Sequence, residues 1–439
     1  MTPSKYDVIV IGAGISGLGV SALLAQAGRK VLTLERARAI GGRAYSFSQK
    51  GHITNMGGPR AGLENGYVDR LFAKLGKEPG ERGFFEEVRT YRDGELMVLA
   101  DLAMKGSLEE AAKLMQASKA LAASPDLSKY DAMSAKEWVS ALVSSPEVLD
   151  VARYSAIVMS TLPRLEDIAA SVLFEALTII QRNPRIYLAA RGYGDFMRIL
   201  AEAAIEHGGE VRTEARADEI VVDDGRVRGV VLRNSRGESE KLEASLVVTA
   251  FPIWDLFGLV AESRFPREFV RMVEQLNRQT AIFGLTVALR EPLYEGKYFV
   301  LTDAPRAEHP LSGFMASNVA PSLSPQGEYL FEVCCQCDIE LGDDRERLRE
   351  TTDLLKEDLE EIFPGWQEGA LWVKPFFHWE EPARNPGRAG VFRPGPKAPA
   401  VAGLYFAGDT VNSRALPGLE TAADSAVICA KEILGELPS

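Results

Sequence analysis

The chain has 439 residues, of which 46% are hydrophobic and 26% are charged, and its formal net charge is −12. This composition is that of a globular protein with room for two domains or one large mixed domain. A net acidic chain argues against a nucleic-acid-binding protein, because such proteins present a basic surface to phosphates. No stretch reaches the run of about 20 apolar residues that a membrane-spanning helix needs, so we expect a cytoplasmic protein.

Cysteine is sparse, and three of the four cysteines lie together in an apolar stretch, at Cys334, Cys335 and Cys337. A structural zinc site needs four ligands, and no second Cys/His pair follows at a useful spacing. We therefore expect buried, reduced thiols and no metal site, as is usual in a reducing cytosol.

The N-terminal residues predict a β-α-β unit: Val8–Ile11 is a short β-branched run, Ser16–Ala27 has helical spacing, and Val31–Leu34 is a second buried strand. The stretch from there to about Gly83 is polar and glycine-rich. Residues 99–180 have a helical pattern throughout and read as a helical insertion.

The remainder alternates between strands and helices, and Asp223-Asp224-Gly225 is a hairpin turn signal. The predicted strands are Val211–Thr213, Glu219–Val222, Val227–Leu232, Leu246–Thr249, Thr280–Leu289, Tyr298–Leu301, Tyr329–Cys335 and Leu404–Ala407. The predicted helices are Phe196–His207, Asp343–Ile362 and Thr421–Leu434, and Pro382–Pro399 is a linker rich in proline and glycine.

A glycine-rich motif, Gly12-Ala13-Gly14-Ile15-Ser16-Gly17, joins the first strand to the first helix. Gly12 permits a tight turn, Gly14 lets the backbone approach a pyrophosphate, and Gly17 lets the helix pack close to the strand. The helix N-terminus supplies N–H donors to the phosphates. Glu35 ends the second strand, where its carboxylate can accept hydrogen bonds from ribose hydroxyls. The adjacent Arg36 is a further predicted cofactor-binding residue.

Two further glycine pairs favour FAD over NAD, which this geometry would serve equally well. Gly41-Gly42-Arg43 follows the ribose-binding acid closely, and Gly57-Gly58-Pro59-Arg60 comes shortly after it. Such pairs suit a long, extended cofactor: Gly41-Gly42 would lie against the pyrophosphate and ribityl chain, Arg43 would neutralise phosphate charge, and Gly57-Gly58 would approach the flavin ring. The alternative is two flexible loops.

A third motif lies near the C-terminus, where a strand ends at Gly408-Asp409 and Gly418-Leu419-Glu420 opens the last helix. The Asp409 carboxylate can hold a ribityl hydroxyl. The N–H groups of Leu419 and Glu420 would point at the flavin C2 carbonyl, where a helix N-terminus stabilises negative charge. In isolation, Gly408-Asp409 would be an ordinary turn.

Together these segments resemble the phytoene desaturase/amine oxidase/protoporphyrinogen oxidase superfamily of FAD enzymes. Arg191–Phe196 also looks like the family's glycine turn before a helix, and Ala217 falls on a strand like the one whose backbone contacts adenine. The resemblance implies an α/β fold, with a Rossmann-type (GR2-like) FAD-binding domain and a discontinuous α+β substrate domain that carries the helical insertion. The expected FAD-binding domain is 1–85, 188–260 and 395–439, and the expected substrate domain is 86–187 and 261–394.

The chain departs from the amine oxidases of this superfamily at two places. Those enzymes set an aromatic side chain shortly before the final helix and a lysine near flavin N5. Here Asn412–Pro417 contains no aromatic residue and Thr280–Leu289 contains no lysine. Both absences favour the phytoene desaturase-like branch. No cysteine precedes Gly408-Asp409 closely, so we expect non-covalent FAD.

Catalytic residues are not legible in the sequence. A flavin can take a hydride from a C–H bond largely through the proximity of N5. Arg60, whose position in the family lies beside the ring, and His378 with Glu380 are the candidates, although His378 among aromatics is more typical of a packed histidine. Residues 99–121 could form a lipid-facing entrance or an ordinary packed amphipathic helix, which leaves a peripheral membrane contact open.

The resulting hypothesis is an FAD-dependent oxidoreductase of the desaturase or dehydrogenase type. It would transfer hydride between flavin N5 and a carbon of a small apolar, cyclic or isoprenoid-like substrate, with a quinone, an electron-transfer protein or O2 as electron acceptor. One alternative is a flavin amine oxidase that produces imine and hydrogen peroxide. Others are a redox-neutral isomerase and a non-catalytic flavin-binding protein.

Overall fold

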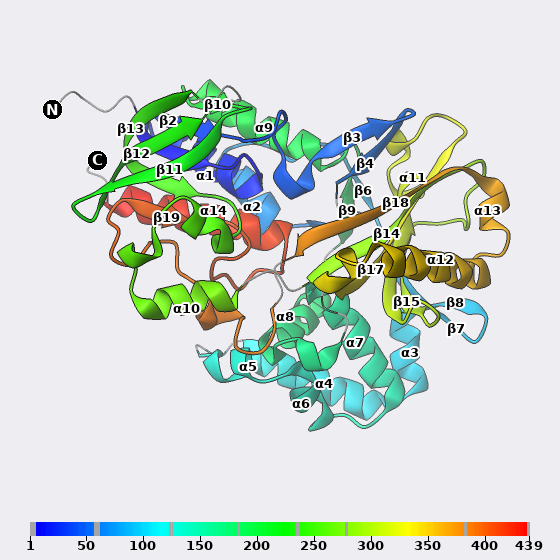
Figure 1. Ribbon diagram of the computed structural model, residues 1–439. Helices are drawn as coiled ribbons and strands as arrows, with labels where there is room; N and C mark the ends of the chain where they lie inside the picture. The colour runs from blue at the N-terminus through cyan, green and yellow to red at the C-terminus, as the bar shows by residue number, and fades with distance from the viewer. Residues whose placement is uncertain are drawn as a thin grey trace.

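The computed structural model describes residues 6–56, 62–122, 124, 126–160, 162, 164–182, 185–233, 238–276, 280–381 and 384–436. Two seven-stranded sheets lie at opposite ends of the molecule, with a helical bundle beneath them in the view of Figure 1. Within the described residues, no helix is both long and apolar enough to cross a membrane.

The first sheet has the strand order β10-β2-β1-β13-β12-β11, with β19 also paired to β13. β10, β2, β1, β13 and β19 are parallel neighbours, whereas β11 and β12 form an antiparallel hairpin that extends the other end of β13. The bounds are β1 Tyr6–Ile11, β2 Val31–Leu34, β10 Glu210–Arg212, β11 Arg216–Asp223, β12 Arg226–Arg233, β13 Ser239–Thr249 and β19 Leu404–Phe406. The predicted β-α-β unit and the hairpin turn at Asp224-Gly225 are both present, and these two residues have the positive φ angles that such turns need.

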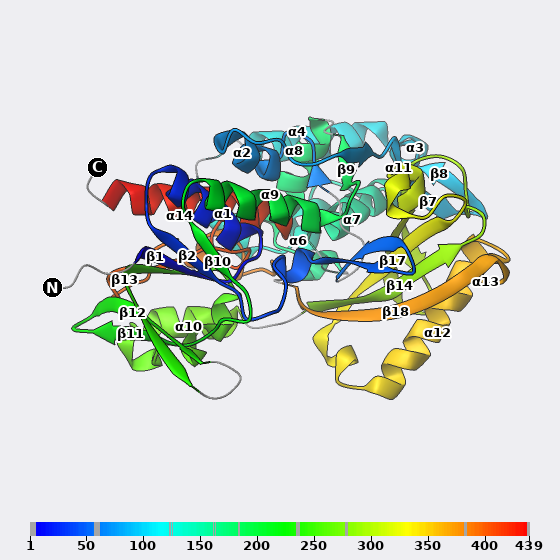
Figure 2. The ribbon, with the colours of Figure 1, turned by 90° about the horizontal axis from the view of Figure 1, so that it is seen from above.

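Three helices cover one face of the first sheet, namely α1 (Ile15–Gln26), α9 (Tyr193–Glu206) and α14 (Leu419–Glu436). Figure 2 shows them above the sheet and α10 (Arg267–Gln275) below it. Both faces of β1 are therefore buried: Val8 and Val10 pack towards α1 and α14, and Ile9 and Ile11 pack into the core beside α10. A strand buried on both faces reads as a continuous apolar run, which is why the sequence identified it.

The second sheet has the order β18-β14-β17-β16-β15-β7-β8 and is antiparallel except between β15 and β7. Helix α12 (Arg345–Ile362) covers one of its faces, where Leu355 and Leu359 pack against Phe283 and Val333. The bounds are β7 Glu87–Arg92, β8 Glu95–Val98, β14 Thr280–Leu289, β15 Tyr298–Ala304, β16 His309–Met315, β17 Tyr329–Asp338 and β18 Ala370–Glu381.

The helical insertion packs around its own core, which includes Trp138, Leu173 and Phe174. Ser134 and Glu137 form a capping box at the start of α6, which satisfies backbone N–H groups at that helix end. Its helices are α3 Leu99–Lys105, α4 Leu108–Ala122, α5 Ser128–Ala132, α6 Ala135–Ser140, α7 Pro146–Ser160 and α8 Ala170–Gln181.

The polar stretch before Gly83 contains more regular structure than its sequence indicates. It holds helix α2 (Tyr67–Lys74) and the strands β3 (Ser46–Gln49), β4 (His52–Asn55), β5 (Gly62–Leu63) and the start of β6 (Arg82–Phe84), of which β5 and β6 pair with β9 (Ile186–Ala189). The hairpin β3–β4 lies beside β18 (Figure 1). The Lys374 ammonium of β18 stands over the Phe47 ring of β3 at 4.3 Å. The second sheet is thus in contact with this separate two-stranded hairpin.

Candidate functional site

The glycine-rich loop closes tightly onto the start of α1. A Cβ atom added at Gly17 would lie 1.9 Å from the Gly12 carbonyl oxygen, so only glycine fits there. A Cβ added at Gly14, in contrast, would meet no atom within 4 Å. Gly14 is the N-cap of α1, and no side chain caps this end. Among the described residues, the N–H groups of Ile15 and Ser16 in the first turn have no backbone acceptor, as an anion site at a helix N-terminus requires.

Glu35 lies beside this loop and is buried. Its carboxylate accepts hydrogen bonds from the backbone N–H of Ala13 at 2.9 Å and of Ala37 at 2.8 Å. Two backbone donors fix the carboxylate at the end of β2, and its remaining lone pairs can accept from ribose hydroxyls. The neighbouring Arg36 has an exposed side chain.

The segment that precedes Ala217 is hydrogen-bonded to the segment around Glu35. The N–H of Ala215 donates to the carbonyl oxygen of Glu35 at 2.8 Å, and the N–H of Glu214 donates to that of Ala37 at 2.9 Å. Ala217 follows on β11, the outer strand of the sheet. The structure thus brings the predicted adenine-contacting strand close to the predicted ribose-binding acid.

Gly41 and Gly42 fold back over the first glycine loop. The N–H of Gly41 donates to the carbonyl oxygen of Ala13 at 2.8 Å. A Cβ added at Gly42 would lie 3.5 Å from the Cα of Gly14. The glycine loop Gly12–Gly17 and the pair Gly41-Gly42 therefore lie together and form one wall. Because this wall is lined by glycine, no side chain obstructs the path of an extended cofactor along it.

Asp409 is buried at the end of β19 and is held by two arginines. Arg43 Nη2 lies 2.5 Å from Asp409 Oδ1, and Arg393 donates to the Asp409 backbone carbonyl oxygen. Burial, with a smaller contribution from Arg384, lowers the pKa of Arg393 to about 9. A Cβ added at Gly408 would lie 4.0 Å from Ser16 Oγ, so this strand end reaches the first turn of α1.

The N-terminus of α14 is the last predicted part of the cofactor site. Gly418 has a φ angle of +78°, and a Cβ there would meet no atom within 4 Å. The first N–H group of this helix with a backbone acceptor is that of Thr421, so in the described part of the chain the N–H groups of Leu419 and Glu420 have no backbone acceptor. Such an end can receive a ligand carbonyl or a negative charge.

The Glu420 side chain has a role that the sequence did not indicate. Its carboxylate accepts backbone hydrogen bonds from Tyr67, from Val68 at 3.3 Å and from Leu63 at 3.4 Å, and so caps the start of α2. Burial raises the pKa of Glu420 to about 7. The side chain thus points to α2, while its backbone N–H remains part of the candidate site.

These residues fit the ADP half and ribityl chain of FAD, on the grounds that an acidic ribose acceptor, two open helix N-termini and a wall without side chains converge in one place. The segment expected beside the flavin ring, Gly57, Gly58, Pro59 and Arg60, lies outside the described residues. The assignment of individual cofactor contacts remains a prediction.

The catalytic candidate His378 lies on β18, opposite Ile282 of β14. Phe377 and Trp379 meet edge to face with their ring centroids 4.7 Å apart and lie against Gly342, on the face that carries α12. By strand alternation His378 faces the opposite side, together with Trp372 and Lys374 near the hairpin β3–β4. Glu380 is also on β18, but its side chain lies outside the described part.

Buried and partly buried ionisable groups at the junctions between the units were missed by the sequence analysis. Except for Arg393, which lies 16 residues before its partner Asp409, they have partners more than 200 residues away in the chain, so no local spacing signals them. They are the buried Asp131, Glu332, Arg384 and Arg393, together with the partly buried Glu175 and Arg414. All four cysteines are buried and free, and no group of metal-ligating side chains occurs among the residues that the structure covers.

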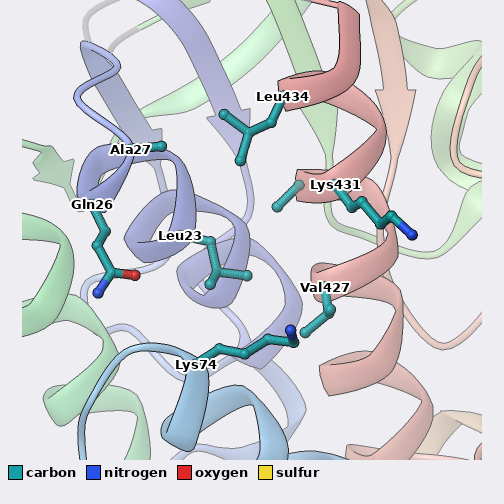
Figure 3. A pocket seen from close by; sticks show the side chains of 8 residues that line it. Leu23, Gln26, Ala27, Lys74, Val427, Lys431 and Leu434 are labelled. Carbon is teal, nitrogen blue, oxygen red and sulfur yellow. The ribbon is translucent and has the colours of Figure 1, made fainter. Parts of the chain in front are cut away.

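A surface groove lies at the opposite end of α1 from the glycine loop (Figure 3). It is lined by Leu23 and Gln26 at the end of α1, by Lys74 of α2, and by Val427 and Leu434 of α14. The C-terminus of a helix carries a partial negative charge, which disfavours phosphate binding. This groove is therefore separate from the candidate cofactor site.

Three comparisons relate the chain to known proteins. The sequence profile of the family described as flavin containing amine oxidoreductase matches residues 15–434. A chloroplastic prolycopene isomerase from Daucus carota is 24% identical over 510 aligned residues, covering 99% of this chain and 80% of the relative.

Among solved structures, an oxidoreductase from Methanosarcina mazei has a TM-score of 0.77 at 22% identity, covering 98% of this chain and all (100%) of its own. The cyclohexylamine oxidase of Brevibacterium oxydans IH-35A has a TM-score of 0.64 at 17% identity, with coverage of 98% and 100%. At these identities the two structures show a shared fold.

Proposed function

Because the chain belongs to the flavin-containing amine oxidoreductase family and its cofactor is FAD, we propose that it is an FAD-dependent oxidoreductase that acts on carbon–carbon bonds of an apolar substrate. The superfamily, the cofactor and the α/β fold class predicted from the sequence are thereby confirmed. The desaturase or dehydrogenase type, and the cyclic or isoprenoid-like character of the substrate, are the parts that we propose.

The proposal rests mainly on the residues that precede α14, Asn412–Pro417, which include no aromatic side chain. In the amine oxidases that the chain resembles, an aromatic side chain is expected there. Here Arg414 occupies this segment and forms a bidentate ion pair with Asp131, with nitrogen–oxygen distances of 2.9 and 3.1 Å. An aromatic face attracts the ammonium group of an amine substrate. An arginine that is paired with Asp131 cannot provide such a face.

Strand β14 also argues against an amine oxidase and for an apolar substrate. All ten of its residues are buried, and none is a lysine or any other ionisable residue. The similarity to a prolycopene isomerase over 99% of the chain agrees with an isoprenoid-like substrate.

The chain's own residues would bind and orient the cofactor. The N-terminus of α1 at Gly14 would receive the pyrophosphate, Glu35 the adenosine ribose, and the Asp409 carboxylate a ribityl hydroxyl. The N–H groups of Leu419 and Glu420 would hold the pyrimidine end of the ring. When bound, FAD supplies hydride exchange with a substrate carbon.

A redox-neutral isomerisation is the second candidate function, because relatives that align with nearly the whole chain are named as isomerases. The two candidates differ in the mass of the product. A desaturase removes two hydrogen atoms from the substrate and needs an electron acceptor such as a quinone, an electron-transfer protein or O2. An isomerase leaves the mass of the substrate unchanged and needs no electron acceptor.

The test is an anaerobic incubation of the yellow holoprotein with a panel of polyenes and cyclic alkenes, followed by mass spectrometry and by the flavin absorbance. Bleaching of the flavin with a product lighter by two hydrogens supports the desaturase. A product of unchanged mass, formed only after prior reduction with dithionite, supports the isomerase. Rapid peroxide formation with amines in air would overturn both in favour of an amine oxidase, and no bleaching by any substrate or reductant would indicate a non-catalytic flavoprotein.

A further inference from the structure

Four charged residues form a quartet between the helical insertion and the last helix, in which Asp131 and Arg384 are buried, the Glu175 side chain is 11% exposed and the Arg414 side chain is 38% exposed. Asp131 of α5 and Glu175 of α8 belong to the insertion, and Arg384 and Arg414 belong to the C-terminal segment. Arg414 binds Asp131 in bidentate fashion, and its Nη1 lies 3.6 Å from Glu175 Oε1. Arg384 Nη1 lies 4.0 Å from Glu175 Oε2.

The quartet reaches the first turn of α14 through Thr421. Arg384 donates to the Thr421 hydroxyl, which in turn donates to the carbonyl oxygens of Leu416 at 2.6 Å and Ala415 at 3.0 Å. Arg414 is in the same loop, four residues before Gly418. The helix start and the loop before it are thus held from the insertion side by two arginines.

The surroundings of Asp131 leave it little freedom. It is fully buried, and one carboxylate oxygen also accepts from the N–H of Val391 at 3.2 Å. A Cβ added at Gly390 would lie 2.1 Å from Asp131 Oδ2, so the backbone passes directly over the carboxylate. The same loop is tied to α5 by the N–H of Gly387, which donates to the Asp131 carbonyl oxygen at 2.8 Å.

Burial acts against the charges of this quartet. It raises the pKa of Glu175 and lowers that of Arg384, in each case as the largest cause. Apolar side chains of similar volume usually stabilise a fold as well as a buried ion pair does. A network of this size is therefore better explained by the geometry that it imposes than by the stability that it adds.

We propose that Asp131 and Glu175 are positioning residues for the cofactor. They fix Arg414 and Arg384, which fix the first turn of α14, and so aim the Leu419 and Glu420 N–H groups at the pyrimidine end of FAD. The helical insertion would in this way set the environment of a ring that it does not hold directly. This inference rests on the FAD site and is independent of the substrate proposed above.

The test compares two bidentate aspartate–arginine pairs of the same insertion. Asp303 binds Arg153 of α7 at 2.8 and 2.7 Å, but it joins the insertion to β15 rather than to α14. Asp131→Asn and matched Asp303→Asn variants are purified as holoproteins. Their FAD dissociation constants are measured by equilibrium ultrafiltration, together with the visible flavin spectrum and the melting temperature.

For Asp131→Asn we expect the dissociation constant to rise about tenfold or more and the flavin bands to shift or lose their fine structure. For Asp303→Asn we expect a lower melting temperature but a dissociation constant within about twofold of the wild type and an unchanged spectrum. If Asp131→Asn lowers only the melting temperature, or if both variants lose FAD equally, the positioning role is wrong.

Arg414→Lys provides the decision if Asp131→Asn does not fold. Lysine keeps the charge but loses the bidentate fork, so a weakened FAD affinity with an altered spectrum supports the proposal. Wild-type affinity and spectrum in that variant would overturn it. Because none of these measurements involves a substrate, their outcome is independent of whether the desaturase assignment holds.

Discussion

Glu332 on β17 accepts a hydrogen bond from the Thr54 hydroxyl on β4 at 2.8 Å, which joins the second sheet to the strand that leads into residues 57–61. The backbone N–H of Asn55 also donates to this carboxyl group, which is buried. Burial raises the pKa of Glu332 to about 7. The contact between the second sheet and the hairpin β3–β4 therefore depends on a carboxyl group that titrates near neutral pH.

Replacement of Glu332 by glutamine should flatten the pH dependence of stability. Because the folded-state pKa is raised above the ordinary value, the contribution of Glu332 to stability is fully present below about pH 4.5 and is lost as the pH rises through 7. Between pH 5 and pH 8 the wild type should lose up to about 3 kcal/mol more unfolding free energy than Glu332→Gln.

Urea unfolding at the two pH values measures this difference. The exposed Glu109 gives the matched control, Glu109→Gln, which should follow the wild type. Glu175 and Glu420 titrate in all three proteins and cancel in the comparison. An identical pH dependence of the unfolding free energy for Glu332→Gln and the wild type would show that the Glu332 carboxyl group does not cause the loss of stability above pH 5.

Gly17→Ala should disrupt the glycine loop. The added Cβ would lie 1.9 Å from the backbone oxygen of Gly12, and backbone cannot move aside as a flexible side chain can. We expect a loss of roughly 2 kcal/mol or more in unfolding free energy and a holoprotein depleted of FAD. Gly258→Ala is the control, because a Cβ there meets no atom within 4 Å. A Gly17→Ala protein with full FAD content would contradict the tight-loop geometry.

The parts of the fold that the sequence predicted are those determined by neighbouring residues. The β-α-β unit rests on the loop from Gly12 to Gly17 and on two apolar runs, and the hairpin rests on Asp224-Gly225. Helix α2 was not predicted, because no residue of its own caps its start. That function falls to Glu420, which lies 353 residues after Tyr67 in the chain.

Strand β18 was not predicted for a different reason. Its sequence contains Pro375 and Lys374, which are atypical of a buried strand. β18 is an edge strand, where proline is tolerated because only one side needs ladder hydrogen bonds. The linker Pro382–Pro399 likewise looks unstructured in sequence, yet it carries Arg384 and Arg393 into buried positions. The pair Asp131–Arg414 spans 283 residues, beyond any local pattern.

Glu35→Gln should weaken FAD binding specifically. The carboxylate accepts from two backbone N–H groups at once, and an amide must turn its NH2 group towards one of them. We expect the FAD dissociation constant to rise about tenfold or more, since one donor loses its acceptor and the ribose loses a charged one. Fluorescence of released FAD reports the change. The exposed Glu109→Gln, in the helical insertion, is the control, and an equal effect of both variants would argue against the ribose assignment.

The arginines of the predicted cofactor site should not be equivalent. Arg43 is partly buried and pairs with Asp409 at 2.5 Å, whereas the Arg36 side chain is exposed. Arg43→Met should leave the Asp409 carboxylate buried without that partner. We therefore expect a cost of about 2 kcal/mol or more in FAD binding, which corresponds to a dissociation constant roughly thirtyfold higher. Arg36→Met should change it by less than about threefold.

A double variant separates the two ways in which Arg43 could act. If Arg43 serves mainly to neutralise Asp409, Arg43→Met combined with Asp409→Asn should bind FAD better than Arg43→Met alone, because the uncompensated charge is gone. If Arg43 serves mainly to attract the pyrophosphate, the double variant should recover nothing, and the affinity of the wild type should fall with added salt more steeply than that of Arg43→Met. Equal losses from Arg36→Met and Arg43→Met would contradict both roles, because burial of the Arg43–Asp409 pair would then have no consequence for the cofactor.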